Sequence, residues 1–378
     1  MPPKKMIIFV PFASDYLTDH QPHGEGLICF SLLNGLAERG HKVFAFSPKV
    51  DIKKKSDNLY VYTTGIRMPL DSLNYFFHSC YSNILFKSLL KKLKFDLVWR
   101  MNPFGSHCPI PPLTQGLPLA LGPFYYEWPN RQATKSKRSP ISLGDVLRPF
   151  SLLGFKNTVA KTDILFSATE GQARQLSKKF IIEKSYSLPL IIEPPSLCPQ
   201  KSFEALKPIF VGNFLENKRP LLFCEVVKEL QKRGFSCEGQ MCGDGPEFEK
   251  VKGYILENKL NITLHGRVSN SEVMKRLDES NILINTSFGE PYGRNNVEAM
   301  SKGLVVFCHN SGGPKDFISS ERNGVLVEDF SSSAFVDALV ANRDNFEEIS
   351  KNAYESSLNW SAEKVLSHLE HHLKAVIS

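Results

Sequence analysis

The sequence predicts an α/β protein with two domains, each built on a parallel sheet covered by helices. The chain has 378 residues, which is longer than most single domains. Short apolar runs of strand length alternate with longer amphipathic runs, the pattern of βαβ units. A proline-rich stretch without helical periodicity separates two such series. We therefore expect an N-terminal domain of residues 1–190, a linker of residues 191–206 and a C-terminal domain of residues 207–359.

Composition and charge indicate a globular cytoplasmic protein. Apolar residues make up 42% of the chain and charged residues 22%, a balance that allows large buried cores. The formal net charge of +7 suits anionic partners without specifying one. The first apolar run, residues 6–10, is too short for a signal peptide or a membrane span. The 8 cysteines form no CxxC pair and no His/Cys cluster, so we expect buried reduced thiols and no zinc site.

The N-terminal series begins with a strand, a glycine-containing loop, a helix and a second strand. Residues 6–10 and 42–46 are the strands, and Gly24 and Gly26 come just before the helix. Glycines at a helix N-terminus let the backbone approach a phosphate without a Cβ in the way. The loop is neither a Walker A sequence nor a dinucleotide fingerprint. A plain glycine-rich turn is therefore an equally good interpretation.

Residues 77–94 form an amphipathic stretch with two possible interpretations. Its apolar positions recur at helical spacing, and Lys87, Lys91 and Lys94 lie along another face. The interpretation that we favour is a core-packed helix with a solvated lysine face. The alternative is a helix that docks on an anionic membrane surface or a lipid-linked acceptor. A second basic stretch, residues 131–138, places further positive charge in the N-terminal half.

Three further strands are predicted in the N-terminal half. They cover residues 95–99, 119–121 and 164–166, and a helix is expected to open near Glu170. His107 lies just beyond the first of these strands, so it would face the sheet edge where ligands bind in α/β proteins.

The C-terminal series starts at residues 208–212, which read as a strand, and continues as a helix through Leu230. A glycine turn follows at residues 243–246. Residues 262–268 contain the next strand, and residues 271–277 the next helix.

Residues 281–316 contain a complete βαβ unit. Residues 282–285 read as a buried strand, and the helix that follows ends near Lys302 and Gly303, a basic residue and a glycine C-cap. Residues 304–308 are a second strand, and residues 311–314 are a second glycine loop.

Two carboxylates in this unit are eight residues apart, Glu290 in the loop and Glu298 in the helix. Both would lie at the carboxyl edge of the strand, where open α/β sheets bind ligands. Backbone N–H groups from Gly293 to Asn296 would lie at the N-terminus of the helix and form an anion-binding site. Either glutamate alone would be an ordinary surface acid. The glycines and strand context around the pair favour a site.

The sequence GEPYGRNNVEAMSKG, with HNSGGPKD and NGVLV after it, resembles family 4 of the retaining glycosyltransferases and their E-x7-E motif. The resemblance extends over roughly residues 207–330 and is weaker in the N-terminal half. It implies the GT-B fold, in which two Rossmann-like βαβ domains face each other across a cleft. The final amphipathic segment, residues 360–378, would pack back on the N-terminal domain. That domain would bind the acceptor, and the C-terminal domain the nucleotide sugar.

The resemblance also implies the reaction. A sugar would move from a nucleoside-diphosphate sugar, of UDP or GDP type, to a glycan, polysaccharide or lipid-linked acceptor. The sugar would keep its anomeric configuration, and no metal or other cofactor would be needed. The protein would lie in the cytoplasm, with a possible peripheral contact to the cytoplasmic face of an anionic membrane.

By the same resemblance, Glu290, Lys218 and His107 would be the catalytic residues. Glu290 would hold the sugar hydroxyls and Glu298 the ribose. The family usually has an arginine where this chain has Asn213, so Arg219 or Arg294 would have to supply the missing charge. The remaining residues expected to bind the donor are Gly24, Gly26, Gly212, Gly266, Arg267, Val268, Pro291, Tyr292, Gly293 and Asn295.

Other functions fit the sequence less well. A sugar-nucleotide epimerase of the same fold would need no acceptor, and a phosphorylase would need a pyridoxal lysine; no sequence feature favours either. A non-catalytic nucleotide-binding protein remains an alternative. The basic residues are not interleaved with aromatic residues as in RNA-binding motifs, so no nucleic-acid partner is expected.

Overall fold

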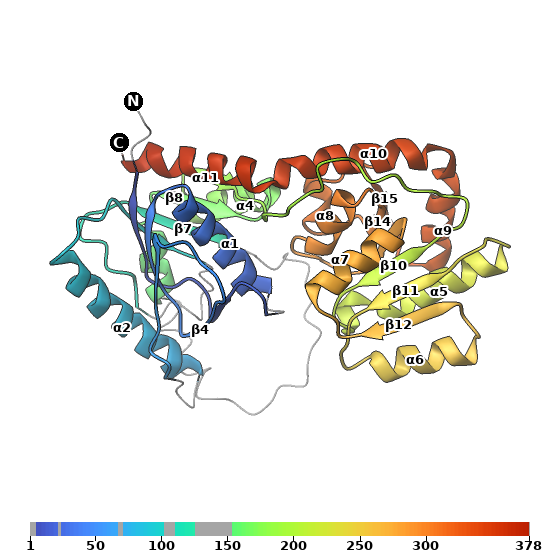
Figure 1. Ribbon diagram of the computed structural model, residues 1–378, viewed down its shortest axis with the longest axis horizontal. Helices are drawn as coiled ribbons and strands as arrows, with labels where there is room; N and C mark the ends of the chain where they lie inside the picture. Colours follow the sequence, from blue (N-terminus) through green and yellow to red (C-terminus); the bar gives the residue numbers. More distant parts are fainter. Residues whose placement is uncertain (1–4, 22–23, 67–70, 102–109, 125–152, 378) are drawn as a thin grey trace. The chain divides into compact units, whose positions relative to one another are not determined.

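The computed structural model describes residues 5–21, 24–66, 71–101, 110–124 and 153–377 (Figure 1). The chain divides into two compact units. Within the described ranges, unit 1 runs up to Ile191 and includes Ala362 onward, and unit 2 runs from Ile192 to Ser361. Each unit has its own parallel sheet and hydrophobic core.

The sheet of unit 1 has seven parallel strands in the order β5-β3-β1-β6-β7-β8-β9. Its central strands are buried on both faces, as expected for a parallel sheet covered by helices. A separate small sheet pairs β2 with β4. The elements are β1 Ile7–Val10, β2 Tyr16–Thr18, α1 Gly24–Glu38, β3 Lys42–Phe46, β4 Lys49–Asp51, β5 Leu59–Tyr62, α2 Asp71–Leu90, β6 Leu97–Arg100, β7 Leu119–Phe124, β8 Ile164–Ser167, α4 Glu170–Phe180, β9 Ser185–Ser187 and α11 Ala362–Ile377.

The last helix, α11, belongs to unit 1 although it follows unit 2 in sequence. Val365, Leu366, Leu369 and Leu373 recur at helical spacing and are buried in the core of unit 1. Arg39 at the end of α1 adds ion pairs to two glutamates of α11. Figure 1 shows α11 along the edge of unit 1, above α1.

The sheet of unit 2 has six parallel strands in the order β12-β11-β10-β13-β14-β15. The order reverses direction between β10 and β13, which is the switch point where ligands bind in open α/β sheets. The elements are β10 Pro208–Val211, η2 Glu216–Lys218, α5 Pro220–Lys232, β11 Gly239–Cys242, α6 Phe248–Glu257, β12 Ile262–Gly266, α7 Asn270–Glu279, β13 Ile282–Asn285, α8 Arg294–Ser301, β14 Val305–His309, η3 Pro314–Asp316, β15 Val325–Val327, α9 Ser332–Ala341, η4 Arg343–Asn345, α10 Phe346–Ser357 and η5 Leu358–Trp360.

The strands predicted from periodicity are confirmed to within a residue or two, except β7, which continues three residues further to Phe124. The helices α5, α7 and α8 are confirmed to within the same margin. The segment from Ile192 to Leu206 contains no helix and leads into β10. It is held by the buried side-chain amide of Asn281. That amide donates to the carbonyl groups of Ser202 and Ala205, so the proline-rich stretch is tied to the start of β13.

One expectation for the N-terminal half is wrong in its geometry. Gly24 and Gly26 were expected in a loop before the helix, but both lie in the first turn of α1. Gly26 is buried and Gly24 is exposed. Periodicity misplaced the boundary because the first three helical residues, Gly24 to Gly26, carry no apolar side chain that would mark them as helical.

The favoured interpretation of residues 77–94 is confirmed in part, because α2 packs on the core of unit 1 through Phe86. Its outer face nevertheless exposes apolar side chains as well as lysines. In the described parts of the chain, no helix is long and apolar enough to cross a membrane.

Candidate active site

The loops that follow β13 and β14 meet at the carboxyl edge of the unit 2 sheet. The Gly313 N–H donates to the Glu290 carbonyl at 2.8 Å, and the Gly289 N–H donates to the Ser311 hydroxyl at 3.2 Å. Gly312 has φ +78, and a Cβ there would lie 2.2 Å from the Glu290 carbonyl oxygen. Only glycine therefore permits this approach. The loop that carries Glu290 and the second glycine loop, both predicted from the sequence, thus contact each other directly.

Glu290 forms an ion pair with Lys218. The Lys218 ammonium of η2 donates to Oε2 of Glu290. Both side chains are largely buried, with exposed fractions of 23% and 14%. The backbone at Lys218 is held in place, since the Thr286 hydroxyl donates to the carbonyl groups of Lys218 and Arg219 at 2.8 and 2.9 Å. The structure therefore brings together the two predicted residues, which are 72 positions apart in sequence.

Glu298 lies on α8 and pairs with Arg294 in the first turn of the same helix. Nε of Arg294 donates to Oε1 of Glu298 at 2.7 Å. The carboxylate is 7% exposed and the guanidinium 31%. An arginine at a helix N-terminus opposes the helix dipole, so its pairing with Glu298 offsets an otherwise unfavourable charge. The pair presents a cation and an anion at the same edge as Lys218 and Glu290.

Three asparagines tie α8 to the strand ends. Asn285 at the end of β13 donates to Asn296 Oδ1 at 2.8 Å, and its own Oδ1 accepts the Ser287 N–H at 3.0 Å. Asn295 donates to the Val211 carbonyl at the end of β10 at 2.8 Å. The side chains of Asn285 and Asn296 were not predicted as part of a site. Polar residues in an otherwise apolar strand and in a buried helix turn are the signal that could have found them.

Glycines close the ends of β10, β11 and β12. The Gly212 N–H donates to the Cys242 carbonyl at 3.0 Å, and the Gly243 N–H to the Gly266 carbonyl at 2.8 Å. A Cβ at Gly243 would lie 1.8 Å from the Gly212 oxygen, so the two backbones touch. The predicted donor residues Gly212 and Gly266 therefore lie along one sheet edge.

The remaining predicted donor residues of unit 2 lie around this edge. Asn213 is exposed directly after Gly212. Arg267 is exposed and lies 3.9 Å from the Asp244 carboxylate, and Val268 follows it. Tyr292 is buried against Phe317, with ring centroids 5.4 Å apart. The carbonyl of Pro291 lies against Gly313, and Gly293 is the N-cap of α8.

Arg219 adopts the left-handed conformation at the N-cap of α5, with φ 49 and ψ 52. Its guanidinium lies over the Phe330 ring, 4.5 Å from the centroid. Of the two arginines considered as a source of the missing charge, Arg294 thus pairs with the expected ribose ligand, and Arg219 stacks on an aromatic ring.

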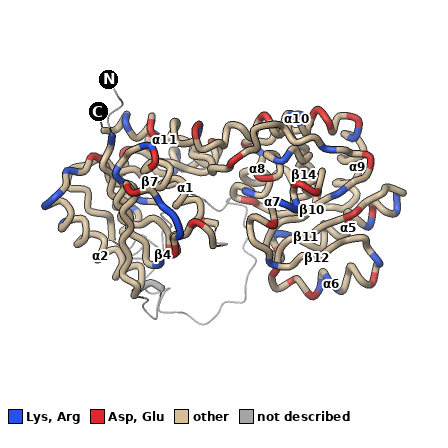
Figure 2. The backbone as a smooth tube through the Cα atoms, in the orientation of Figure 1, with Lys and Arg blue, Asp and Glu red and all other residues tan. Residues whose placement is uncertain are grey.

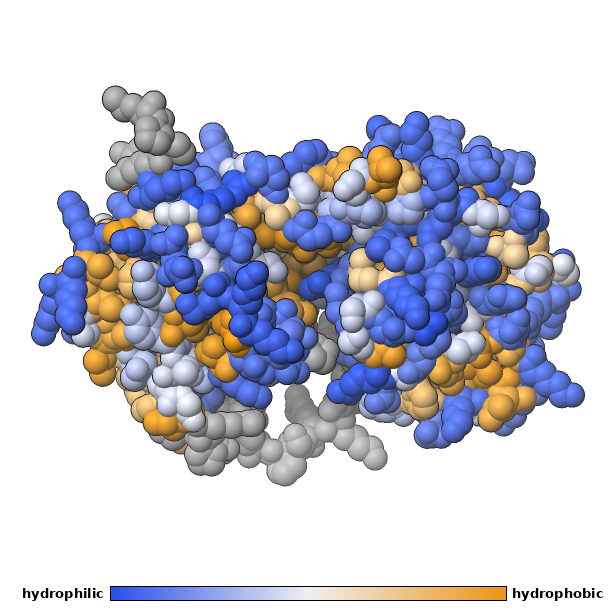
Figure 3. Space-filling view, in the orientation of Figure 1, coloured by the Kyte–Doolittle hydropathy of each residue, from blue (hydrophilic) through white to orange (hydrophobic). Residues whose placement is uncertain are grey.

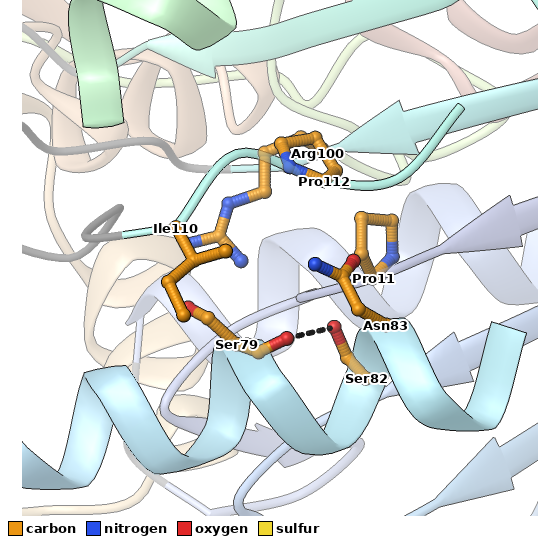
Figure 4. Close-up of a pocket in the computed structure, with 7 residues that line it drawn as sticks. All are labelled: Pro11, Ser79, Ser82, Asn83, Arg100, Ile110 and Pro112. Atoms are coloured by element: carbon orange, nitrogen blue, oxygen red, sulfur yellow. Dashed lines mark hydrogen bonds between the residues drawn. The ribbon is translucent and has the colours of Figure 1, made fainter. Parts of the chain in front are cut away.

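His107 lies outside the described residues. The carboxyl edge of unit 1 holds a different cation, Arg100 at the end of β6, which is buried and lies over the Phe12 ring at 4.3 Å. Figure 4 shows its guanidinium pointing from β6 toward Ser79 of α2. The cavity there has a volume of about 10 Å³, room for one water. It is lined by Pro11, Ser79, Ser82, Asn83, Arg100, Ile110 and Pro112.

The cysteines follow the expectation of buried thiols in most places. Among the described residues all are free, and Cys29, Cys224, Cys237, Cys242 and Cys308 are buried. Burial raises the pKa of Cys308 to about 12, and the nearby Glu290 carboxylate adds to this shift. In the part of the chain that the structure describes, no three His, Cys, Asp or Glu side chains gather as a potential metal site.

The architecture is the GT-B fold of glycosyltransferases, with two Rossmann-like domains. A sucrose-phosphate synthase from Thermosynechococcus elongatus has the same fold, with a TM-score of 0.73, 16% identity and 99% of each chain covered. At this identity the likeness concerns the fold only.

The sequence of unit 2 is similar to one protein family. Residues 202–356 match the family model described as "Glycosyl transferases group 1". This segment is therefore similar to group 1 glycosyltransferase domains, which supports a transferase domain. The match includes the Lys218–Glu290 pair, the Arg294–Glu298 pair and both glycine loops.

Curated relatives match over shorter stretches. A 2-deoxystreptamine N-acetyl-D-glucosaminyltransferase from Niallia circulans is 28% identical over 34% of this chain and 34% of its own length. A poly(ribitol-phosphate) alpha-N-acetylglucosaminyltransferase from Staphylococcus aureus is 26% identical over 46% of this chain and 35% of its own length. The matches thus span about a third of the length of these relatives.

Proposed function

We propose that the protein is a retaining glycosyltransferase that moves a sugar from a nucleoside-diphosphate sugar to a glycan, polysaccharide or lipid-linked acceptor. The observation that carries this proposal is the Lys218–Glu290 ion pair at the switch point of a group 1 glycosyltransferase domain. The matched relatives named above are N-acetylglucosaminyltransferases named for 2-deoxystreptamine and poly(ribitol-phosphate), which supports a polar acceptor.

Lys218 has the role of a cation for the leaving diphosphate. Negative charge builds on the phosphate oxygens as the bond to the anomeric carbon breaks, and a fixed ammonium group stabilises that charge most strongly in a largely buried site. The backbone N–H groups at the start of α8 point to the same edge and add to this stabilisation. When the diphosphate binds, Lys218 would share its donors between phosphate and Glu290.

Glu290 has the role of a ligand for the transferred sugar. Its carboxylate is held by Lys218, and its backbone carbonyl is held by Gly313, so its position is defined by two loops. An ionised carboxylate accepts hydrogen bonds from sugar hydroxyls and stabilises positive charge on the ring in an oxocarbenium-like transition state. Glu298, already paired with Arg294, is suited to accept both ribose hydroxyls.

The reaction is proposed to need no metal or other cofactor, because the ammonium group and the helix N-terminus together neutralise the leaving group. Activity that persists at an unchanged rate after treatment with a chelator would agree with this. Activity that is lost on chelation and restored by Mg²⁺ or Mn²⁺ would refute it.

The acceptor is proposed to meet unit 1, and a lipid-linked acceptor would bring the protein to a membrane surface. The outer face of α2 exposes Leu73, Phe76 and Ile84, with exposed fractions of 42%, 52% and 67%. Lys87 near the end of α2 and Lys91 just after it are also exposed. Figure 2 shows lysines and arginines in blue along the backbone of unit 1. Figure 3 shows apolar surface on this side of unit 1. Apolar side chains beside lysines match the composition of a surface that binds anionic lipids.

Sedimentation with vesicles tests the membrane contact. Binding to vesicles that contain anionic lipid, but not to neutral vesicles, is expected for the wild-type protein. Ile84→Ser should weaken this binding, whereas Leu256→Ser, at a similarly exposed leucine on a helix of unit 2, should not. Equal binding of both variants and the wild type would remove α2 from the proposal.

Turnover of labelled donors tests the enzyme itself. UDP, GDP and ADP sugars are first screened for thermal stabilisation, since a ligand at 100 times its dissociation constant adds about 2.7 kcal/mol. The stabilising donor is then incubated with saccharide and lipid-linked acceptors. NMR of the product should show the anomeric configuration of the donor, and an inverted product would refute the retaining mechanism.

A further inference from the structure

Three aromatic rings gather at the carboxyl ends of β13, β14 and β15. Phe288 lies in the loop after β13, His309 ends β14 and Phe330 follows β15. The centroids of the His309 and Phe330 rings are 3.4 Å apart and nearly parallel, and those of Phe288 and Phe330 are 5.3 Å apart. We name Phe288, His309 and Phe330 the aromatic cluster. Glu290 lies in the same loop as Phe288.

The aromatic cluster is held rigidly. The Phe288 N–H donates to the Asn217 carbonyl at 2.8 Å, and His309 Nε2 contacts the Glu328 carbonyl at 2.8 Å. Burial lowers the pKa of His309, so its ring is neutral and its Nε2–H donates to that carbonyl. The Arg219 guanidinium covers the Phe330 ring. A ligand would therefore meet a preformed surface and would spend little free energy on ordering it.

Phe288 is the member of the cluster that faces solvent. It is 41% exposed, while His309 and Phe330 are half-buried. An exposed phenyl ring that is fixed at a ligand-binding edge leaves apolar area in water that a ligand can cover. The exposed Arg219 lies over the neighbouring Phe330 ring and offers hydrogen-bond donors.

The strand order indicates which part of a substrate lies there. The residues Gly266 to Val268, which the resemblance to family 4 places near the nucleobase of the donor, are at the end of β12, which is one edge of the sheet. β14 and β15 are at the opposite edge, and the Lys218–Glu290 pair comes from the segments after β10 and β13 between them. A nucleotide sugar whose base lies at β12 and whose diphosphate lies at Lys218 therefore places its sugar toward the aromatic cluster.

We propose that the aromatic cluster is a sugar-binding subsite in which a pyranose ring stacks its C–H face on Phe288 while Arg219 donates to its hydroxyl groups. Stacking removes apolar area of both rings from water, and the hydroxyl groups at the rim remain solvated or bonded. This inference rests on the proposed function and adds a contact that Glu290 and Glu298 do not make. The ring belongs to the donor or to a glycan acceptor.

Calorimetry on the full chain tests the subsite with defined probes. The wild-type protein is titrated with UDP, GDP and ADP, then with UDP-glucose, UDP-N-acetylglucosamine, GDP-mannose and ADP-glucose, and then with maltotriose and chitotriose. Phe288→Ala should weaken binding of the sugar-bearing probe about five- to tenfold and leave the bare nucleoside diphosphate unchanged. Phe288→Tyr should restore binding. Leu256→Ala, at another exposed apolar side chain of unit 2, is the matched control.

The outcomes separate the sources of the ring. Weaker binding of sugar nucleotides alone assigns the subsite to the donor sugar, and weaker binding of the oligosaccharides alone assigns it to the acceptor. If Phe288→Ala leaves both unchanged, or weakens bare diphosphates as much as sugar nucleotides, the subsite is refuted while the proposed function stands. A wild-type protein that binds none of the nucleotides would overturn the proposed function together with this inference.

Discussion

Replacing Gly312 with alanine should displace Glu290 and abolish most of the activity. Gly312 has φ +78, where a Cβ costs about 1 kcal/mol. The new Cβ would lie 2.2 Å from the Glu290 carbonyl oxygen, whereas real Cβ atoms essentially never approach closer than 3.0 Å. The two loops must therefore separate by at least 3.0 − 2.2 = 0.8 Å. That movement stretches the 2.8 Å hydrogen bond from the Gly313 N–H, which contributes about 1 kcal/mol.

These terms add to a loss of about 2 kcal/mol for unit 2, or a fall in Tm of about 4–8 °C for a unit of this size. Because a shift of about 1 Å in a positioning group can cost about 100-fold in rate, we expect a loss of this order in kcat. Differential scanning calorimetry and donor turnover are the assays.

Gly253→Ala is the matched control for this change. Gly253 lies in α6, and a Cβ there would meet nothing within 4 Å. Alanine in a helix interior is favoured over glycine by about 1 kcal/mol, so this variant should be slightly more stable and fully active. If Gly312→Ala were as stable and as active as Gly253→Ala, the close contact between the two loops would not exist in solution.

Three further predictions follow from the charges of the two units. Lys218→Ala should lower kcat about 100- to 1,000-fold with little change in donor affinity, whereas Glu298→Ala should mainly raise the dissociation constant of the donor; unchanged kinetics in both would remove the site assignment. Burial and two neighbouring histidines lower the pKa of His372 to about 4. Between about pH 6.5 and pH 4, His372 binds a proton in the unfolded chain but not in the folded chain. The free energy of unfolding should therefore fall as the pH drops through this range. His372→Phe keeps a ring against Tyr186 and should flatten this dependence in thermal unfolding, and an equally steep profile would contradict the assignment. If the N-terminus of α8 binds the diphosphate of the donor, inorganic pyrophosphate should compete with the donor. A lack of competition would argue against a diphosphate site there.

Much of the fold could be predicted from sequence because its elements are local. The central strands of both units are buried on both faces, so each is a short continuous apolar run that stands out from its neighbours. α5 and α7 have a clear apolar stripe. The boundary of α1 was missed since its first turn, from Gly24, has no such stripe.

The candidate site was predictable only as a set of residue types. Glu290, Glu298 and the glycine loops were recognised because they are close in sequence and share a known spacing. The partner of each carboxylate was not predictable in the same way. Lys218 reaches Glu290 from 72 positions away, and Arg294 pairs with Glu298 rather than remaining free for a phosphate. The Asn285–Asn296 contact and the aromatic cluster were not foreseen, since their members come from separate segments.

The sequence by itself determined that the chain forms two α/β units and that an acidic pair lies at the start of a helix. These features follow from short-range periodicity and spacing, which act within a few turns of the chain. The tertiary structure alone decided which cation neutralises which carboxylate and which rings assemble beside them. Strand order brings those groups together, and strand order depends on the burial of whole sheet faces rather than on any local pattern.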